Sequence, residues 1–324
     1  MGKLKSGLTG DLGEKLRAYL PIAVFVILVV VSSFLSKNFF TLQNIFNLLR
    51  QNSGTILVSL GMLLVILTGG IDLSVGSIAA FSSVLFATLL DGRSSPPMAL
   101  PLALLITLLC SMAFGALVGY LVAFQKMAAF VATLASMTAA RGVAYMISHA
   151  KTIPISNRLV NIFNKGSYFG VPFSVILALA FFICVALILK FTSYGRFVQA
   201  IGSNETAVRL SGIRTNFYIM SVYVISAFMC TFAGIIESRT GVGDARVSQG
   251  LELDAIAACV IGGASLSGGK GTAVNTLMGV LILGLIGNIM ALMKVAPYPQ
   301  QVIKGVIIIV AVLLQGKDKN RRSH

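Results

Sequence analysis

The chain has 324 residues, of which 56% are hydrophobic and only 11% are Asp, Glu, Lys or Arg. A soluble globular domain carries about 25% charged residues, so this composition excludes a soluble domain and makes lipid the solvent for most of the chain. The net charge of +15 gathers at the N-terminus, within 190–214 and at the C-terminus. This is the positive-inside pattern of membrane proteins, and it argues against nucleic-acid binding.

Long charge-free runs follow one another along the chain. A transmembrane helix needs about 20 apolar residues, because the hydrocarbon core is about 30 Å thick. The runs are continuous Leu, Ile, Val, Ala and Phe, without the alternation of barrel strands. We therefore predict an all-α, polytopic membrane protein with about ten transmembrane helices. The predicted spans are 20–36, 52–71, 75–90, 98–123, 128–148, 171–190, 216–237, 251–268, 272–293 and 299–315.

The N-terminal part contains a basic segment, an apolar run and an amphipathic stretch. Residues 1–19 are predicted to lie in the cytoplasm. The run 20–36 is not followed by an A-x-A cleavage site and is predicted to be an uncleaved anchor. Residues 39–51, FFTLQNIFNLLRQ, are predicted to lie at the membrane interface before the second span.

A glycine-rich motif, GGIDLSVG at 69–76, separates the second and third predicted spans. Paired glycines leave the helical region easily, so the motif predicts an interrupted helix. Asp72 and Ser74 are predicted to cap the helix that follows, and Asp72 also fits a group that lines a watery path. The candidate residues of a translocation path are Gly69, Gly70, Asp72 and Ser74.

One charge falls inside a predicted span. Arg141 lies within 128–148, and a charge at membrane depth is costly, so we expect it to face protein or water. It is predicted to pair with Asp72 or a backbone carbonyl, or to extend toward the interface. We count it among the candidate path residues. The polar residues 149–170 that follow are predicted to form the main external loop.

The main cytoplasmic loop, 191–215, contains the stretch SNETAVRLSG at 203–212. This pattern predicts a short capped helix, with Ser203 or Asn204 as the N-cap and Gly212 at the C-terminal stop. Glu205 would lie at the positive end of the helix dipole, and Arg209 one turn further on.

An outer hairpin and the start of the next span carry a group of charged residues. Glu252 and Asp254 open the segment GLELDAIAA at 250–258, where acidic residues favour the helix dipole. The alternative is contact with an external binding protein or with the mouth of the pathway. The candidate residues for that contact are Arg239, Asp244, Arg246, Glu252 and Asp254.

The stretch GGASLSGGKGT at 262–272 resembles a phosphate-binding loop only superficially. A Walker loop needs glycine five positions before its Gly-Lys pair and a hydroxyl after the lysine, but this chain has Ala264 and Gly271 there. We therefore predict no nucleotide, metal or other cofactor on this chain. The stretch instead repeats the first motif as G-G-x-x-L-S-x-G, 193 positions later, and predicts a second interrupted helix. Its candidate path residues are Gly262, Gly263, Ser265 and Ser267, the two serines also being predicted caps.

Three stretches together resemble the permease subunit of bacterial ABC importers for simple sugars, of the ribose type. They are LVILTGGIDLSVGSIAA (64–80), GRFVQAIGSNETAVRLSGI (195–213) and LELDAIAACVIGGASLSGGKGT (251–272), and they occur in the expected order. The resemblance covers nearly the whole chain. Branched-chain amino acid permeases share a weaker version of the first motif, so the implied fold is better supported than the implied substrate.

The resemblance implies a transport subunit without enzymatic activity. It implies one transmembrane domain, 20–316, in the bacterial inner membrane, with both termini and the basic tail 317–324 in the cytoplasm. Its expected partners are a second permease subunit, most simply an identical one, two ATPase domains that hold ATP and Mg²⁺, and a periplasmic or tethered sugar-binding protein. The cytoplasmic helix would dock the ATPase through Gly202, Asn204, Glu205, Ala207, Arg209, Leu210 and Gly212.

Two alternatives remain open at this point. The same machinery could carry a branched-chain amino acid, a nucleoside or a quorum-signal sugar derivative. An ion-coupled secondary transporter would instead need a buried titratable carboxylate at membrane depth, for which Asp72 is the candidate.

Overall fold

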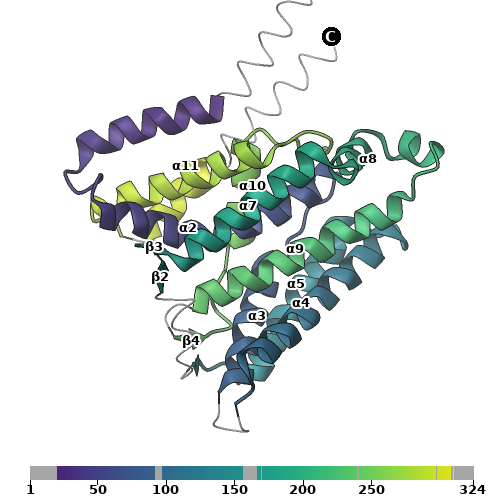
Figure 1. The fold of residues 1–324 in the computed structure, drawn as a ribbon, viewed down its shortest axis with the longest axis horizontal. Coiled ribbons are helices and arrows are strands. Elements are labelled where there is room, and N and C mark those ends of the chain that lie inside the picture. Colours follow the sequence, from purple (N-terminus) through teal and green to yellow (C-terminus); the bar gives the residue numbers. More distant parts are fainter. Residues whose placement is uncertain are drawn as a thin grey trace, which may run out of the picture.

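The computed structural model describes residues 20–91, 97–155, 166–168, 170–238, 241–296, 298–307 and 309, and these are mainly helical. A first helix, Leu20–Leu35, precedes the labelled elements (Figure 1). The labelled helices are α2 (Leu42–Leu67), α3 (Val75–Leu90), α4 (Leu100–Ala123), α5 (Ala129–Ser148), α7 (Phe173–Phe191), α8 (Ser193–Leu210), α9 (Thr215–Glu237), α10 (Leu251–Ile261) and α11 (Ala273–Leu292).

Two short antiparallel strand pairs lie at the end of the bundle opposite α8 (Figure 1). Strand β1 (Ile153–Pro154) pairs with β4 (Val242–Gly243), and β2 (Ser167–Tyr168) pairs with β3 (Val171–Pro172). These pairs define what we call the strand end, and α8 defines the α8 end.

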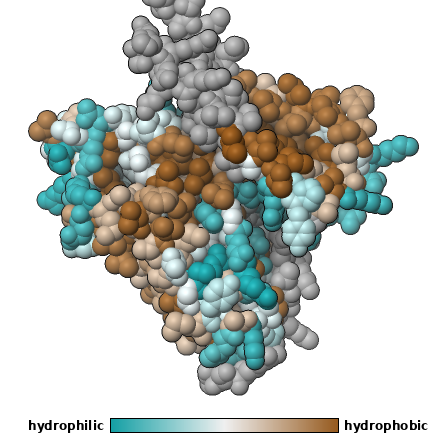
Figure 2. All heavy atoms as spheres, turned by 180° about the vertical axis from the view of Figure 1, so that it is seen from behind, coloured by the Kyte–Doolittle hydropathy of each residue, from teal (hydrophilic) through white to brown (hydrophobic). Residues whose placement is uncertain are grey.

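Six helices of the described part are long and apolar enough to cross a membrane: α2, α4, α5, α7, α9 and α11. Hydrophobic residues cover much of the face shown in Figure 2. On α4 the leucines at 102, 105, 109 and 117 are all exposed, and they lie on one face of the helix. The prediction of an all-α, polytopic membrane protein is confirmed.

Helix α9 is the centre of the bundle and packs against α2, α3 and α4 (Figure 1). Its inward residues Tyr223, Ala227, Cys230 and Ala233 are fully buried. Small residues allow this close packing, because a Cβ on Gly115 of α4 would lie only 2.6 Å from the Ala227 Cβ.

The stretch predicted to lie at the membrane interface, 39–51, is continuous with the second span, because α2 begins at Leu42 and runs to Leu67. Thr41 caps the helix, accepting a hydrogen bond from the Asn44 N–H at 3.3 Å. The Asn44 and Asn288 amides also bond each other in both directions, at 3.1 and 2.9 Å. Extending an existing helix avoids a second nucleation cost, so the stretch stays in the helix.

The predicted helical span 251–268 is too long, because α10 ends at Ile261. Its 11 residues cover about 16 Å, roughly half of the hydrocarbon core. The residues before it, 244–250, are neither helix nor strand. They make the other half of this crossing, as their neighbours on α3 indicate.

Segment 244–250 runs alongside α3, and its contacts with that helix show how far it enters the bundle. Gly243 packs against Ser83, whose hydroxyl is 2.8 Å from that of Ser238, directly after the end of α9. The Ser248 carbonyl packs against Gly76, two turns earlier on α3. That offset along a helix corresponds to about 10 Å, so the segment descends about 10 Å from the end of α9 into the bundle.

Several predictions fall on residues outside the described part. These are the segment 1–19, the tail 317–324, Arg239, and residues 156–165 and 169 of the predicted external loop.

Candidate functional site

Helix α2 ends in a glycine turn within the first motif. Gly69 has a φ of +83°, a conformation that glycine adopts without strain. Its N–H donates to the Ile66 carbonyl at 2.9 Å, and the Gly70 N–H donates to Val65 at 3.1 Å. These are the two bonds of a Schellman C-cap, which stops the helix sharply.

Helix α10 ends in the same way within the second motif. Gly263 has a φ of +81°, its N–H donates to Val260 at 2.8 Å, and the Ala264 N–H donates to Cys259 at 2.9 Å. The structural equivalent of Gly69 is therefore Gly263, one position later than the sequence repeat suggests. The predicted interruption of both helices is confirmed, with this shift in register.

The two motifs differ after the turn. Helix α3 begins at Val75, inside the first motif, whereas α11 begins at Ala273, after the second. Thr272 caps α11 by accepting a hydrogen bond from the Asn275 N–H at 3.2 Å. Ser265 and Ser267 instead bond each other at 2.8 Å, so their predicted capping role is wrong: the helix starts too far along the chain for them to reach it.

Asp72 stabilises the turn that leads into α3. The side chain is 2% exposed. Its Oδ1 accepts from the Ser74 N–H at 2.9 Å and the Ser74 hydroxyl at 2.5 Å, and its Oδ2 accepts from the Ser226 hydroxyl at 3.2 Å. Ser74 occupies the N-cap position, but its side chain bonds Asp72 and caps no helix N–H, so its predicted side-chain cap is wrong.

Both glycine turns meet α8 at what we call the glycine joint: Leu67, Gly202, Gly268 and Gly269. The Gly269 N–H donates to the Leu67 carbonyl at 3.0 Å. Gly202 packs its backbone onto both, since a Cβ there would lie 2.6 Å from the Gly269 nitrogen and 2.9 Å from the Leu67 carbonyl carbon. Three segments thus touch through main-chain atoms, directly before the short predicted helix.

That short helix is present, and we call residues 205–210 the docking helix. Asn204 breaks α8 with φ −160° and ψ 92°, and its Oδ1 accepts from the Ala207 N–H at 3.0 Å. Of the two possible N-caps, Asn204 is therefore the one used. Gly212 follows the C-cap with a φ of +81°, as predicted for the stop.

Glu205 at the start of the docking helix is held by side chains from two other segments. Its Oε1 lies 3.3 Å from the Lys126 Nζ, in the turn between α4 and α5, and accepts from the Thr215 hydroxyl at 3.2 Å. Lys126 also donates to Asn216 at 3.0 Å. This network fastens the docking helix to the start of α5 and of α9.

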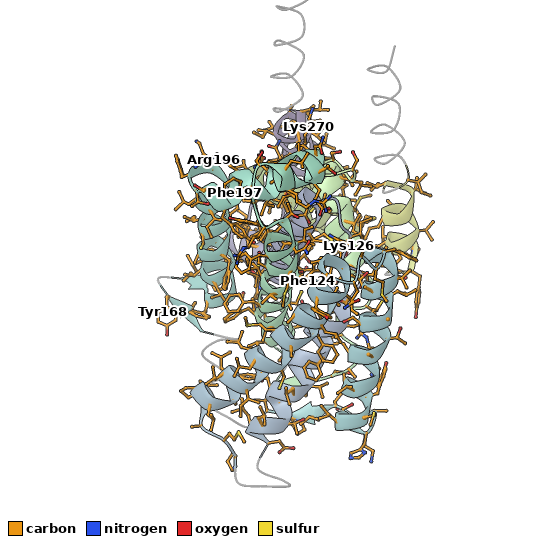
Figure 3. All side chains as sticks on the ribbon, turned by 90° about the vertical axis from the view of Figure 1, so that its right-hand side faces the viewer. Phe124, Lys126, Tyr168, Arg196, Phe197 and Lys270 are labelled. Atoms are coloured by element: carbon orange, nitrogen blue, oxygen red, sulfur yellow. The ribbon has the colours of Figure 1, made fainter. Side chains whose placement is uncertain are left out.

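The outward side of the docking helix is open. Leu210 is 83% exposed, and Ala207 and Arg209 are also exposed. Figure 3 faces this end of the bundle, where exposed Lys126, Arg196 and Lys270 come from three different segments. The docking helix thus presents one large apolar side chain and one arginine outward, at an end of the bundle that carries several exposed basic residues.

At the other end, Arg141 of α5 holds segment 244–250. Its Nη1 donates to the carbonyls of Ala245 at 2.5 Å and Val247 at 2.8 Å. Of the predicted partners, backbone carbonyls are therefore the ones found. Asp244 and Arg246 of the same segment form a two-point ion pair, Nε to Oδ1 at 3.1 Å and Nη2 to Oδ2 at 3.0 Å.

The two acidic residues of α10 lie in its first turn, as predicted. Glu252 is 8% exposed and faces Gly76 of α3. Asp254 is paired with Lys304 of the helical stretch 298–307 at 2.9 Å. Within the described residues, no three His, Cys, Asp or Glu side chains converge to bind a metal ion.

Comparison with known proteins gives one consistent result. The family profile "Branched-chain amino acid transport system / permease component" matches residues 44–312. The ribose import permease protein RbsC of Escherichia coli K12 is 40% identical, over 92% of this chain and 93% of its own. RbsC of Bacillus subtilis 168 is 39% identical over 92% of each chain.

A further relative transports a different sugar by its name. The L-arabinose ABC transporter permease protein AraH of Azospirillum brasilense is 33% identical, over 93% of this chain and 88% of its own. No solved structure matches the chain. The chain belongs to the family of branched-chain amino acid transport system permease components.

Proposed function

We propose that this protein is the membrane permease subunit of an ABC importer for a monosaccharide of the ribose or arabinose type. ATP is hydrolysed by partner subunits, and this chain supplies the path. The observation that carries the proposal is the exposed docking helix, which begins three positions after Gly202 of the glycine joint. A push on that helix reaches the end of α2 and the loop between α10 and α11 without passing through flexible side chains.

The orientation follows from where the basic residues lie. The α8 end carries exposed Lys126, Lys190, Arg196, Arg209, Arg214 and Lys270, so it is the cytoplasmic end by the positive-inside rule. Both termini then lie in the cytoplasm of a bacterial cell, and the strand end faces outward.

The partners follow from this arrangement. Two copies of the chain form the membrane path, most simply as a homodimer. Two ATPase domains dock on the cytoplasmic end through the docking helix, and they bind ATP and Mg²⁺. A periplasmic or tethered sugar-binding protein delivers the solute to the strand end. No nucleic acid takes part, and membrane lipid covers the apolar flanks.

The test is ATP-dependent uptake in proteoliposomes that contain the permease, its ATPase and its binding protein. We expect labelled D-ribose or L-arabinose to accumulate only when ATP is present on the ATPase side. Leucine serves as the alternative cargo, given the name of the family. Uptake by the permease alone, driven by an H⁺ or Na⁺ gradient, would refute the proposal in favour of a secondary transporter.

A further inference from the structure

Segment 244–250 places irregular backbone at membrane depth. It starts beside Ser83, level with the end of α9, and reaches Gly76 about 10 Å deeper before α10 begins. Irregular backbone at this depth is stable only where protein buries it or where it lines a water-filled cavity. The side chains of the segment show which of these applies.

The segment has one buried side and one open polar side. Ala245 is 1% exposed and faces the core, whereas Arg246 and Gln249 are exposed. The Arg246 side chain is 61% exposed despite its ion pair with Asp244. An exposed arginine and an exposed glutamine here require water beside them, because lipid would leave their hydrogen-bonding groups unpaired.

The open side is held in a fixed orientation. The two bonds from Arg141 bind the carbonyls on either side of Arg246, at Ala245 and Val247. Ser248 and Gly250 have φ values of +60° and +79°, which turn the chain into α10. Arg141 is thus a positioning residue that presents Arg246 toward the cavity.

The chemistry of this side suits hydroxyl groups. Nε and one N–H of Nη2 of Arg246 bind Asp244, so three of the five guanidinium N–H donors remain available. Asp244 contributes carboxylate acceptors, and Gln249 contributes both an amide donor and an acceptor. This set matches the neighbouring hydroxyls of a sugar, each of which both donates and accepts a hydrogen bond.

We propose that Asp244, Arg246 and Gln249 form a solute-contact site that binds the hydroxyl groups of a neutral monosaccharide on its way from the strand end toward α10. This inference rests on the proposed function and adds the place of solute contact. Binding there is weak, since the site offers one polar face without an aromatic platform, and weak binding lets the solute leave.

The first test is water access. In vesicles with the strand end outward, Gln249→Cys is treated with a charged, membrane-impermeant methanethiosulfonate, and labelling is read by mass spectrometry. Native Cys110 is the matched control, because it is exposed on α4 where lipid covers it. We expect labelling at position 249, slowed by D-ribose, and none at Cys110. No labelling at position 249, or labelling that D-ribose does not slow, would overturn the proposal.

The second test is uptake. Arg246→Gln should lower ATP-dependent D-ribose uptake at low concentration about tenfold, the effect of losing a charged hydrogen bond. Lys151→Gln, the same charge change at the same end of the bundle, should leave uptake unchanged. Uptake by Arg246→Gln at the wild-type level would overturn the proposal. If the Arg246→Gln permease no longer co-purified with the binding protein, Arg246 would be a protein contact, and the proposal would also be overturned.

These outcomes can be separated from failure of the proposed function. If the wild-type importer itself showed no ATP-dependent uptake, the proposed function would fall. If the wild-type importer worked and only the predicted effects at 246 and 249 were missing, the solute-contact site alone would fall.

Discussion

Replacing Gly202 by alanine tests whether the glycine joint transmits motion. A Cβ at this position would clash most severely with the Leu67 carbonyl oxygen, and it would also lie 2.6 Å from the Gly269 nitrogen and 2.9 Å from the Leu67 carbonyl carbon. Comfortable contacts lie at about 3.5–4.0 Å, so these backbone segments must separate by more than about 1 Å. The bond from Gly269 N–H to the Leu67 carbonyl, now 3.0 Å, then becomes too long to hold.

The expected change in the free energy of unfolding has three contributions. Overpacking costs about 1–3 kcal/mol, and the lost hydrogen bond about 1 kcal/mol more. Alanine in α8 returns up to about 1 kcal/mol in helix propensity. The net loss of about 1–4 kcal/mol is below the total stability of a typical protein, so the chain should still fold and insert.

Transport should suffer much more than folding. We expect Gly202→Ala to retain ATP hydrolysis by the docked ATPase but to lower solute uptake per ATP at least tenfold, because the docking helix no longer fits both glycine turns. The assay is uptake and phosphate release in the same proteoliposomes, with unfolding followed in detergent. Gly142→Ala is the control, since no atom lies within 4 Å of a Cβ there. Wild-type uptake per ATP in Gly202→Ala would refute the reasoning.

Three other predictions concern the same machinery. Glu205→Lys should reduce coupled uptake by placing two cations together, and adding Lys126→Glu should restore it; no recovery would mean that their 3.3 Å contact is not used. Leu210→Asp should abolish co-purification with the ATPase without changing thermal stability, since the side chain is 83% exposed; retained co-purification would place docking elsewhere. Asp72→Asn should cost about 1–3 kcal/mol of stability by weakening bonds to Ser74 and Ser226, and should impair uptake more than assembly; unchanged uptake would leave Asp72 as a turn stabiliser alone.

Hydropathy predicted the ordinary spans closely. The run 75–90 matches α3, and 128–148 matches Ala129–Ser148 within one residue. These helices are predominantly apolar, with Arg141 the one charge in the two, so composition largely determines them. The motif at 203–212 was equally informative, because capping depends on residues within one turn of each other.

The sequence was misleading where distant contacts decide the structure. Residues 251–268 read as a span because hydropathy does not distinguish one continuous helix from an 11-residue helix that a glycine turn ends at Ile261. The cap of α11 depends on where that helix starts, which moved the role from Ser265 to Thr272. Lys126 gave no local signal, since its partner Glu205 is 79 positions away.

The glycine joint has a consequence for how such importers diversify. Its contacts are made by main-chain atoms, so their geometry is indifferent to the side chains displayed a few residues further along the chain. The outward residues of the docking helix can therefore change together with the ATPase, while the main-chain contacts of the glycine joint stay the same. The same permease fold can in this way work with different ATPases.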